Sequence, residues 1–499
     1  MEALVELCKK IVGDKYASDE EHIRWVYSRC DTGPWRERMP EVVVRPGDTE
    51  DVSEIVKIAN RFKAPIWPQG GGTLPSGGGA LTPQGIVMDL TRLAEIDIRE
   101  DDRIVVTGAG ATWGALIYEL WKRNLDTFRG PGSGKSATVG GSVSMATNWH
   151  ASARYGGCGD VAVGVEVVLG TGEVLKTSSA SKWPHEFFAR YGGGPDITGL
   201  FIGDQGTMGI KTKVALPLAE KTQSVDGISW MNSDAKDLEN AIRKIAGLEL
   251  ATDLVFHDDG IFRTYEYYKD TVGLNGVGPE MRRLMTAYFK DLEESKIDTG
   301  KAATLAFAIV EGHKNESVAI KMDMVKQIIK ENNGWIIGRN YAMDYYTNQL
   351  HAFYQPWRNV DIGRGTNWVG LGGLIRLSEF AKARKLYHDY LAENKEDLDK
   401  YGMFGGYMGY LHMTSSFALY PCFFCDQWEV TTRKRMIYHS RRLRDLFLSS
   451  TTGWYPYYIG EFGSEGMVKA WTGPHYLVLK QLKQVFDPNH IINPGMLGL

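Results

Sequence analysis

The sequence predicts an α+β protein with two domains, and three observations favour this class. The chain has 499 residues, and at about 150 residues per domain this length suits two or three domains. Short apolar strands alternate with amphipathic helices along the chain. Clustered glycines lie in the first half, whereas strands separated by long charged helices follow residue 224. We therefore expect a glycine-rich domain and a second domain with its own core.

Composition and charge exclude several classes of function. The formal net charge is −4 and the pI about 6.3, so we expect no nucleic-acid partner. No run of apolar residues is long enough to span a membrane, and Glu2 and Glu6 lie where a secretory signal needs a basic end and an apolar core. Five cysteines make no disulfide scaffold. We expect a cytoplasmic protein with reduced thiols.

Hydrophobic periodicity predicts the elements of the first domain. Residues 1–35 are expected to form a polar, helical and peripheral segment. Strands are expected over 41–44, 65–68, 86–90, 103–107, 161–169 and 174–177, with helices over 50–62 and 112–123. Either Asp48 or Thr49 can cap the first of these helices. Together they predict one α+β domain over residues 41–220.

Beyond residue 224 the clearest elements are two strands and two long helices. The strands are expected over 303–311 and 370–377, and the helices over 314–332 and 378–394. Cys422 and Cys425 resemble half of a zinc site, but no second cysteine pair or spaced histidine cluster accompanies them. In a strand these two thiols face opposite ways. We expect buried thiols here and no metal site.

The segment Pro68–Gly79 carries the strongest functional signal. Six of the ten residues from 70 to 79 are glycine, and they follow a buried strand. Successive backbone N–H groups can converge on an anion there, because no Cβ blocks its approach. A flexible linker is the alternative, but a linker would be polar on both sides. The loop therefore predicts a cradle for a pyrophosphate.

Two other glycine segments imitate nucleotide motifs. Gly134-Lys135-Ser136 ends like a P-loop, but Arg129 stands where that motif needs its first glycine. Gly108–Gly114 nearly forms a dinucleotide fingerprint, with Trp113 at the third glycine position and no acidic strand end at the expected distance. A nucleotide triphosphatase is therefore not expected, and a Rossmann NAD site is the runner-up for the second segment.

Small residues are dense in two further segments. Ser136–Val143 could let a flat group lie against the backbone, although close helix packing explains it equally well. Gly203–Gly209 has a Gly-x-x-Gly-x-x-Gly spacing that exposes backbone amides, which alone is a weak signal.

Taken in order, these segments resemble the FAD-binding fold of the vanillyl-alcohol oxidase and p-cresol methylhydroxylase superfamily. The matching pieces include PEVVVRPGDTEDV, IWPQGGGTLPSGGGA, VVTGAGATWGAL, RGPGSGKSATVGGSV, DITGLFIGDQGTMGI and FDPNHIINPGML. They cover most of residues 40–220 and the last fifty. The resemblance implies a two-subdomain FAD-binding fold with an α+β cap. The FAD-binding domain would span 1–222, with 448–499 returning to it, and the cap 223–447.

The resemblance also implies which residues contact FAD. The pyrophosphate would lie on Gln69, Gly70, Gly71, Gly72, Thr73 and Leu74. The rest of the cofactor would run along Pro131, Gly132, Ser133, Thr138, Gly140, Gly141, Ser142, Gly209 and Ile210. Relatives with a covalent link carry a histidine where this chain has Gly72 and Thr73. Others use a cap histidine or tyrosine, for which His412 is the nearest candidate. We expect non-covalent FAD.

Two branches of the superfamily compete for the substrate. The D-2-hydroxyacid branch binds a metal through several cap histidines. This chain keeps only His412 in the first histidine segment, and Phe462 replaces the histidine of the second. The phenol branch has a Tyr-Arg pair, which Tyr457 and Tyr458 match only at the tyrosine. We expect an aromatic or bulky apolar substrate.

The loss of the arginine removes a fixed charge that would lower a phenol's pKa. Lys469, Arg358 or Arg364 could replace it only if the fold brings one close. In phenol oxidases an acidic residue follows the Gly-Gly-Ser segment, and here His150 is the candidate. An imidazole, with a pKa of about 6.5, can accept a hydroxyl proton.

The resemblance thus implies an FAD-dependent oxidase or dehydrogenase that moves a hydride from a benzylic or alcohol carbon to flavin N5. Tyr457 and Tyr458 would orient the substrate and His150 would accept a proton. The aromatic run from Tyr341 to Trp368 would form the pocket wall, although such residues are more often core than pocket. The alternatives are a D-2-hydroxyacid dehydrogenase and a flavoprotein subunit for electron transfer. The electron acceptor is open among oxygen, a quinone and a protein. Relatives commonly dimerise, which implies a homo-oligomer.

Overall fold

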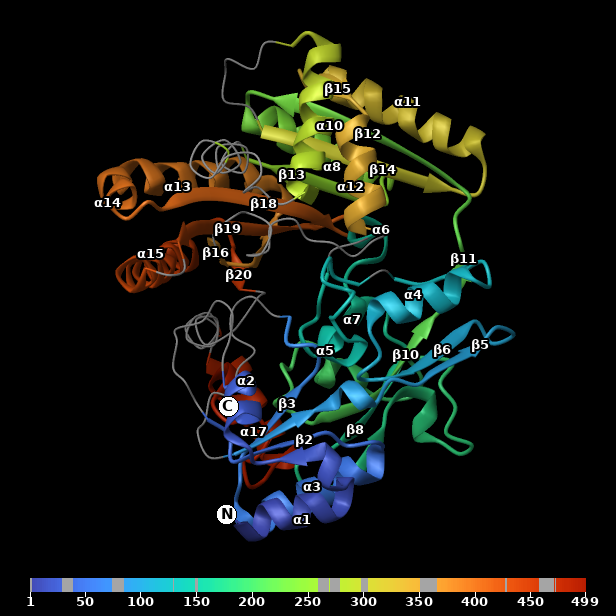
Figure 1. Ribbon diagram of the computed structural model, residues 1–499. Helices are drawn as coiled ribbons and strands as arrows, with labels where there is room; N and C mark the ends of the chain where they lie inside the picture. The colour runs from blue at the N-terminus through green and yellow to red at the C-terminus, as the bar shows by residue number, and fades with distance from the viewer. Residues whose placement is uncertain are drawn as a thin grey trace. The chain divides into compact units, whose positions relative to one another are not determined.

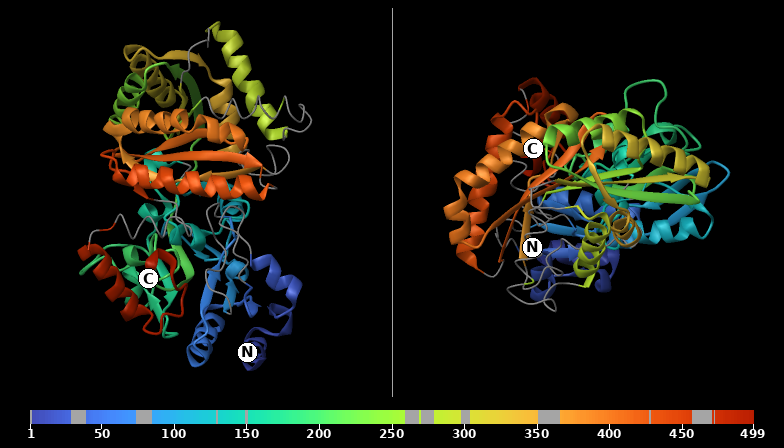
Figure 2. Two further views of the ribbon diagram at one scale, coloured as in Figure 1. Left: turned by 90° about the vertical axis from the view of Figure 1, so that its left-hand side faces the viewer. Right: turned by 90° about the horizontal axis from the view of Figure 1, so that it is seen from above.

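The computed structural model describes residues 2–28, 39–73, 85–128, 130–148, 151–258, 269, 279–297, 304–350, 366–426, 429–456, 471 and 473–499. The chain forms two compact units (Figures 1 and 2). The first unit holds residues 1–148, 157–220 and 459–499, and the second holds 149–156 and 221–458. Both units combine helices with sheets, so the predicted α+β class is confirmed.

A small, mostly parallel sheet carries the first part of the first unit. Its strands run in the order β1 (Ala17–Ser18), β2 (Val42–Val44), β4 (Ile86–Asp89) and β3 (Ile66–Gln69), with β1 antiparallel to β2. The helices are α1 (Glu2–Val12), α2 (Glu21–Tyr27) and α3 (Thr49–Phe62). Asp48 caps α3 by accepting a hydrogen bond of 2.9 Å from the Asp51 amide. This choice between Asp48 and Thr49 was open in the sequence.

The prediction of a peripheral segment over residues 1–35 is wrong for α1. Leu4, Val5, Cys8 and Val12 share one buried side of that helix. They join the same hydrophobic core as α3 and the parallel sheet. These apolar residues recur at helical spacing, so they form one face of α1, although the segment as a whole is polar.

An antiparallel sheet carries the second part of this unit. Its order is β5 (Ile96–Arg99), β6 (Ile104–Gly108), β10 (Ile210–Pro217), β8 (Gly164–Val168) and β9 (Val174–Lys176). The remaining elements are α4 (Trp113–Trp121), β7 (Leu125–Asp126), α5 (Val139–Ser144), α7 (Cys158–Val161), β11 (Ala219–Glu220) and α17 (Gly473–Phe486). β8 begins three residues later than expected, because α7 occupies Cys158–Val161.

This sheet rules out the runner-up interpretation of the segment Gly108–Gly114. A Rossmann site needs a parallel strand–helix–strand unit, whereas β6 is antiparallel to both of its neighbours. A Cβ at Gly108 would lie 2.2 Å from the Leu93 carbonyl oxygen, and one at Gly110 would lie 2.0 Å from that of Leu90. These glycines therefore permit close backbone packing.

The second unit is built on one antiparallel sheet of nine strands. Its order is β15 (Trp335–Gly338), β12 (Ser224–Asn232), β14 (Thr304–Gly312), β13 (Asp253–His257), β18 (Phe404–His412), β19 (Ser416–Asp426), β17 (Gly373–Arg376) and β20 (Tyr455–Pro456), and β16 (Thr366–Gly370) also pairs with β19. The helices are α6 (Ser152–Tyr155), α8 (Ala235–Gly247), α10 (Pro279–Ser295), α11 (Asn315–Glu331), α12 (Asn340–Tyr345), α13 (Phe380–Glu393), α14 (Lys395–Lys400) and α15 (Val430–Ser449).

The two faces of this sheet bury different cores. One face packs against α8, α11, α13 and α15, and the last two run alongside the β18–β19 hairpin (Figures 1 and 2). The other face packs against α10 and α12. Cys422 belongs to the second core and Cys425 to the first. The prediction of two buried thiols that face opposite ways is confirmed.

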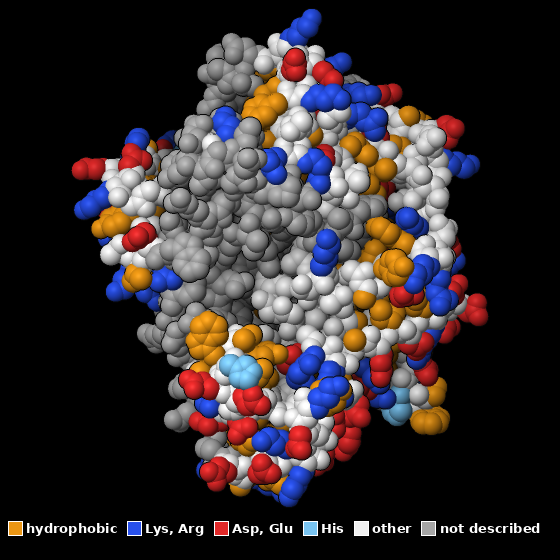
Figure 3. Space-filling model, viewed as in Figure 1, with side chains coloured by type: hydrophobic (Ala, Val, Ile, Leu, Met, Phe, Trp, Pro, Cys, Tyr) orange, Lys and Arg blue, Asp and Glu red, His pale blue; other side chains and the backbone are white. Residues whose placement is uncertain are grey.

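Charged side chains of both signs are interspersed over the described residues of the face drawn in Figure 3. This distribution matches the small net charge of −4. None of the described helices is long and apolar enough to cross a membrane.

A buried histidine in the second core gives a prediction for acid stability. His257 is fully buried, and its Nδ1 lies 2.7 Å from the Tyr341 hydroxyl. Burial lowers the pKa of His257 to about 3, whereas an unfolded histidine has a pKa of about 6.5. Between these values the unfolded chain binds a proton that the folded chain does not. The free energy of unfolding should therefore decrease as the pH is lowered from about 6.5 towards 3. This group contributes up to about 1.4 kcal/mol of that decrease per pH unit.

Urea unfolding of the wild type and of His257→Gln at several pH values between 7 and 4 tests this contribution. We expect the variant to lose less of its remaining stability as the pH falls, because its side chain does not titrate. The exposed His313 of the same unit supplies the control. His313→Gln should keep the wild-type slope, and an equal slope in all three proteins would contradict the assignment to His257.

Candidate functional site

The glycine loop that follows β3 packs tightly against a second loop of the first unit, Ser136–Thr138, which leads into α5. A Cβ at Gly70 would lie 2.2 Å from the Thr138 Oγ1, and one at Gly71 would lie 1.7 Å from the Ser136 carbonyl oxygen. Gly72 has a φ of +62°, a conformation that favours glycine. No residue with a side chain fits at Gly71 unless the backbone moves.

The second loop is held by the turn that opens α4. The Trp113 amide donates to the Ala137 carbonyl at 3.1 Å, and its indole Nε1 donates to the Ser142 Oγ at 2.8 Å. The Gly140 amide donates to the Ala109 carbonyl at 2.9 Å. Thr138 caps α5 through the Gly141 amide, at 3.3 Å. Gly140 and Ser142 therefore pack against the turn before α4, in addition to the cofactor contact predicted for them.

The third predicted segment, Gly203–Ile210, also reaches these loops. The Gly203 amide donates to the Val143 carbonyl at 3.0 Å, and the Gln205 amide to that of Ser144 at 2.8 Å. A Cβ at Gly206 would lie 3.2 Å from Pro68, at the base of the glycine loop. The three segments that the sequence singled out therefore meet within the first unit.

The C-terminal segment joins the same place, and the sequence had singled out none of its residues individually. The Ile66 amide donates to the Ile491 carbonyl at 2.6 Å, and the Asn493 amide donates to that of Ile66 at 2.8 Å. The Asn493 side chain donates to the Gln205 carbonyl at 2.6 Å. The turn residues of DPNHIINPG were the available signal, because Asn, Pro and Gly mark a defined turn.

The residues of this site fit a diphosphate. Among the described residues, no acceptor is bonded to the backbone amides of Gly71 and Gly72. The two residues follow a buried strand and have no Cβ, so an anion can approach their amides closely. Of the predicted cofactor contacts, only Leu74 lies outside the described residues.

The three predicted catalytic residues, His150, Tyr457 and Tyr458, lie outside the described residues, as do Arg358, Arg364, Phe462 and Lys469. Their described neighbours in the chain are anchored on the sheet of the second unit. The Ala151 amide donates to Asp253 Oδ1 at 2.6 Å, and Pro456 pairs with Gly373. Ala151 and Pro456, the described neighbours of His150 and Tyr457 in the chain, are therefore fixed to this sheet.

The described part of the proposed aromatic wall is core. Tyr341 and Tyr345 are fully buried and pack with Phe307 and Met285 between the sheet and two helices. The prediction that they line a pocket is wrong, because their spacing on α12 directs both rings into the core. His412 lies at the end of β18, with its Nδ1 3.3 Å from the Ser416 hydroxyl.

The composition of the β18–β19 hairpin bears on whether the second unit could bind a metal ion. On one face it carries Met408, Tyr410, Tyr420 and Cys422, all buried. The rings of Tyr410 and Tyr420 stack, with centroids 5.5 Å apart. Over the described residues, no three histidine, cysteine, aspartate or glutamate side chains gather as a metal site would need.

Comparison with known proteins defines the class of the chain. Residues 40–178 match the FAD binding domain family, so this part of the chain is an FAD-binding domain and the predicted cofactor, FAD, is confirmed. The whole chain shares its fold with p-cresol methylhydroxylase.

Two solved structures carry this fold assignment. p-Cresol methylhydroxylase superposes with a TM-score of 0.81 at 19% identity, covering 100% of this chain and 96% of that one. The 4-ethylphenol oxidase of Gulosibacter chungangensis gives a TM-score of 0.82 at 17% identity, covering 100% and 97%. At such identities the likeness is one of fold.

Curated relatives come from the other branch. The D-lactate dehydrogenase of Archaeoglobus fulgidus is 26% identical over 51% of this chain and 55% of its own length. The glycolate oxidase subunit GlcD of Bacillus subtilis is 29% identical over 43% and 44%. The chain thus spans about half the length of these relatives.

Proposed function

We propose that this protein is an FAD-dependent oxidoreductase that takes a hydride from a benzylic or alcohol carbon of an aromatic or bulky apolar substrate. The FAD-binding domain and the fold shared with p-cresol methylhydroxylase support the chemistry. The composition of the β18–β19 hairpin is the observation that carries the substrate class.

In the D-2-hydroxyacid branch, the segment equivalent to 405–412 supplies metal ligands. Here one face of that hairpin holds a thioether, two phenols and a thiol, from Met408, Tyr410, Tyr420 and Cys422. A metal that polarises a small hydroxyacid needs several imidazole or carboxylate ligands. These four side chains are buried in the core and supply no such set, which disfavours the metal-dependent branch and leaves the phenol branch.

The residues of the chain would divide the work as follows. The amides of Gly70, Gly71 and Gly72 would bind the diphosphate, without a lysine or a metal. Bound FAD supplies the hydride acceptor. His150 would take up the proton of the substrate hydroxyl on its imidazole, and Tyr457 and Tyr458 would orient the polar end of the substrate. FAD would be held without a covalent bond.

A D-2-hydroxyacid dehydrogenase is the second candidate. The curated relatives favour it, since D-lactate dehydrogenase and glycolate oxidase sequences match this chain at 26% and 29% identity. The matched length is about half of the chain in each case. These matches therefore support the cofactor more directly than the substrate.

Anaerobic mixing of the FAD-loaded protein with single substrates separates the two candidates. We expect para-alkylphenols or aryl alcohols to bleach the visible flavin band, and D-lactate and glycolate to leave it unchanged with or without added Zn²⁺ or Mn²⁺. Metal-dependent bleaching by D-lactate alone would contradict the proposal. Acid precipitation should release the flavin into the supernatant, and light scattering should show the proposed homo-oligomer.

A further inference from the structure

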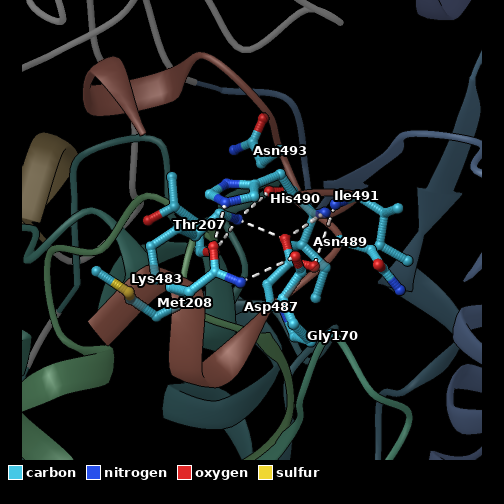
Figure 4. Close-up of polar contacts among 12 residues, drawn as sticks. Gly170, Thr207, Met208, Lys483, Asp487, Asn489, His490, Ile491 and Asn493 are labelled. Atoms are coloured by element: carbon cyan, nitrogen blue, oxygen red, sulfur yellow. Dashed lines mark hydrogen bonds and ion pairs between the residues drawn. The ribbon is translucent and has the colours of Figure 1, made fainter. Parts of the chain in front are cut away.

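Two buried ion pairs lie where the C-terminal helix α17 meets the segment Gly203–Ile210. Lys211 Nζ lies 2.6 Å from Asp204 Oδ1, and Lys483 Nζ lies 2.6 Å from Asp487 Oδ2 (Figure 4 shows the second pair). The four side chains are at most 2% exposed. Burial lowers the pKa of Lys483, and the charges of Asp487 and Asp204 oppose that shift.

Lys483 does more than neutralise its partner. Its ammonium also donates to the carbonyl oxygens of Thr207 and Ile492, both at 2.7 Å. An ammonium has three donors, so all of them are engaged. Asp487 in turn accepts from the amides of Ile491, at 3.1 Å, and Ile492, at 2.8 Å.

The two carbonyls belong to segments that flank the base of the glycine loop. Thr207 lies in the Gly203–Ile210 segment, whose Gly206 approaches Pro68. Ile492 precedes Asn493, which bonds to Ile66 and to the Gln205 carbonyl. One ammonium thus fixes two backbone segments that frame the start of the loop at Gln69.

Stability alone does not account for a buried ion pair at this place. Burying two charges costs several kcal/mol per ion, and a well-packed apolar pair of similar volume is often equally stable. An apolar pair, however, cannot donate to the carbonyls of Thr207 and Ile492. The chemistry specific to lysine is this orientation of two peptide groups.

We propose that Lys483 is a positioning residue for the cofactor, holding Thr207–Ile210 and Ile491–Asn493 in the conformation that binds FAD. The inference rests on the FAD site proposed above. It predicts that cofactor affinity depends on the Lys483 ammonium even where the stability of the fold does not.

The double variant Lys483→Met/Asp487→Leu separates positioning from stability. Lys483→Met alone leaves Asp487 buried and unpaired, so it should lower both the melting temperature of the FAD-free protein and the affinity for FAD. The double variant should recover the melting temperature. Its dissociation constant for FAD, measured by quenching of flavin fluorescence, should stay raised by about 10- to 100-fold, the effect of losing a charge-assisted hydrogen bond.

A half-buried ion pair in the second unit is the control. Lys236 and Glu239 pair on α8, with the Glu239 side chain fully buried. Lys236→Met/Glu239→Leu should leave the dissociation constant for FAD unchanged, whatever it does to the melting temperature.

Wild-type FAD affinity in a folded Lys483→Met/Asp487→Leu protein would overturn the inference and leave the proposed function standing. Failure of the wild type to bind FAD would remove the proposed function itself. If the double variant does not fold, Asn493→Gly decides, because it cuts only the side-chain link to Gln205 and keeps every buried charge. A weaker affinity then supports positioning, and an unchanged affinity overturns it.

Discussion

Replacing Gly71 with alanine should abolish FAD binding at concentrations that saturate the wild type. The added Cβ would lie 1.7 Å from the Ser136 carbonyl oxygen, and that atom belongs to a backbone that other contacts hold in place. The two loops must therefore separate, which moves the amides of the glycine loop away from the diphosphate. We expect the dissociation constant to rise by at least about 100-fold, or about 2.7 kcal/mol.

Titration of the FAD-free protein with FAD, followed by flavin fluorescence, measures this loss. Gly193→Ala is the matched control in the same unit, because a Cβ at Gly193 meets nothing within 4 Å. The control should bind as the wild type does. Binding of FAD by Gly71→Ala within about threefold of the wild type would show that the diphosphate does not lie on this loop.

The features that could be predicted from the sequence are those that local chemistry decides. The helix after the first strand was expected over 50–62 and lies at Thr49–Phe62, because its apolar period and its cap are both local. Strand alternation placed Cys422 and Cys425 in opposite cores. The close backbone contacts of the glycine loops could also be predicted, because few other roles explain so many adjacent glycines.

The features that could not be predicted depend on distant partners. Nothing near Ile104–Gly108 shows that this strand pairs antiparallel with Ile210–Pro217, a contact across about a hundred residues. Lys483 looks like one more lysine on a polar helix until Thr207 and Asp487 surround it. Its burial follows from the fold, and fully buried lysines are rare.

His150→Asn should slow reduction of the flavin by substrate about 10²- to 10⁴-fold, the usual contribution of a positioned general base. The substitution removes the imidazole that would accept the hydroxyl proton. Its effect on the dissociation constant of FAD should be small, because the proposed diphosphate contacts lie in the glycine loop. Stopped-flow mixing of the FAD-loaded protein with an aryl alcohol under anaerobic conditions measures the rate.

The pH profile distinguishes a base from a residue that merely supports the fold. With His150 as the base, the wild-type rate should fall as the pH decreases through the pKa of the imidazole, ordinarily about 6.5, because the protonated ring cannot accept. His150→Asn should lose this step along with its rate, whereas His313→Gln, changed at an exposed position, should retain both. A slow variant that keeps the step would assign the titration to another group and leave His150 a structural part.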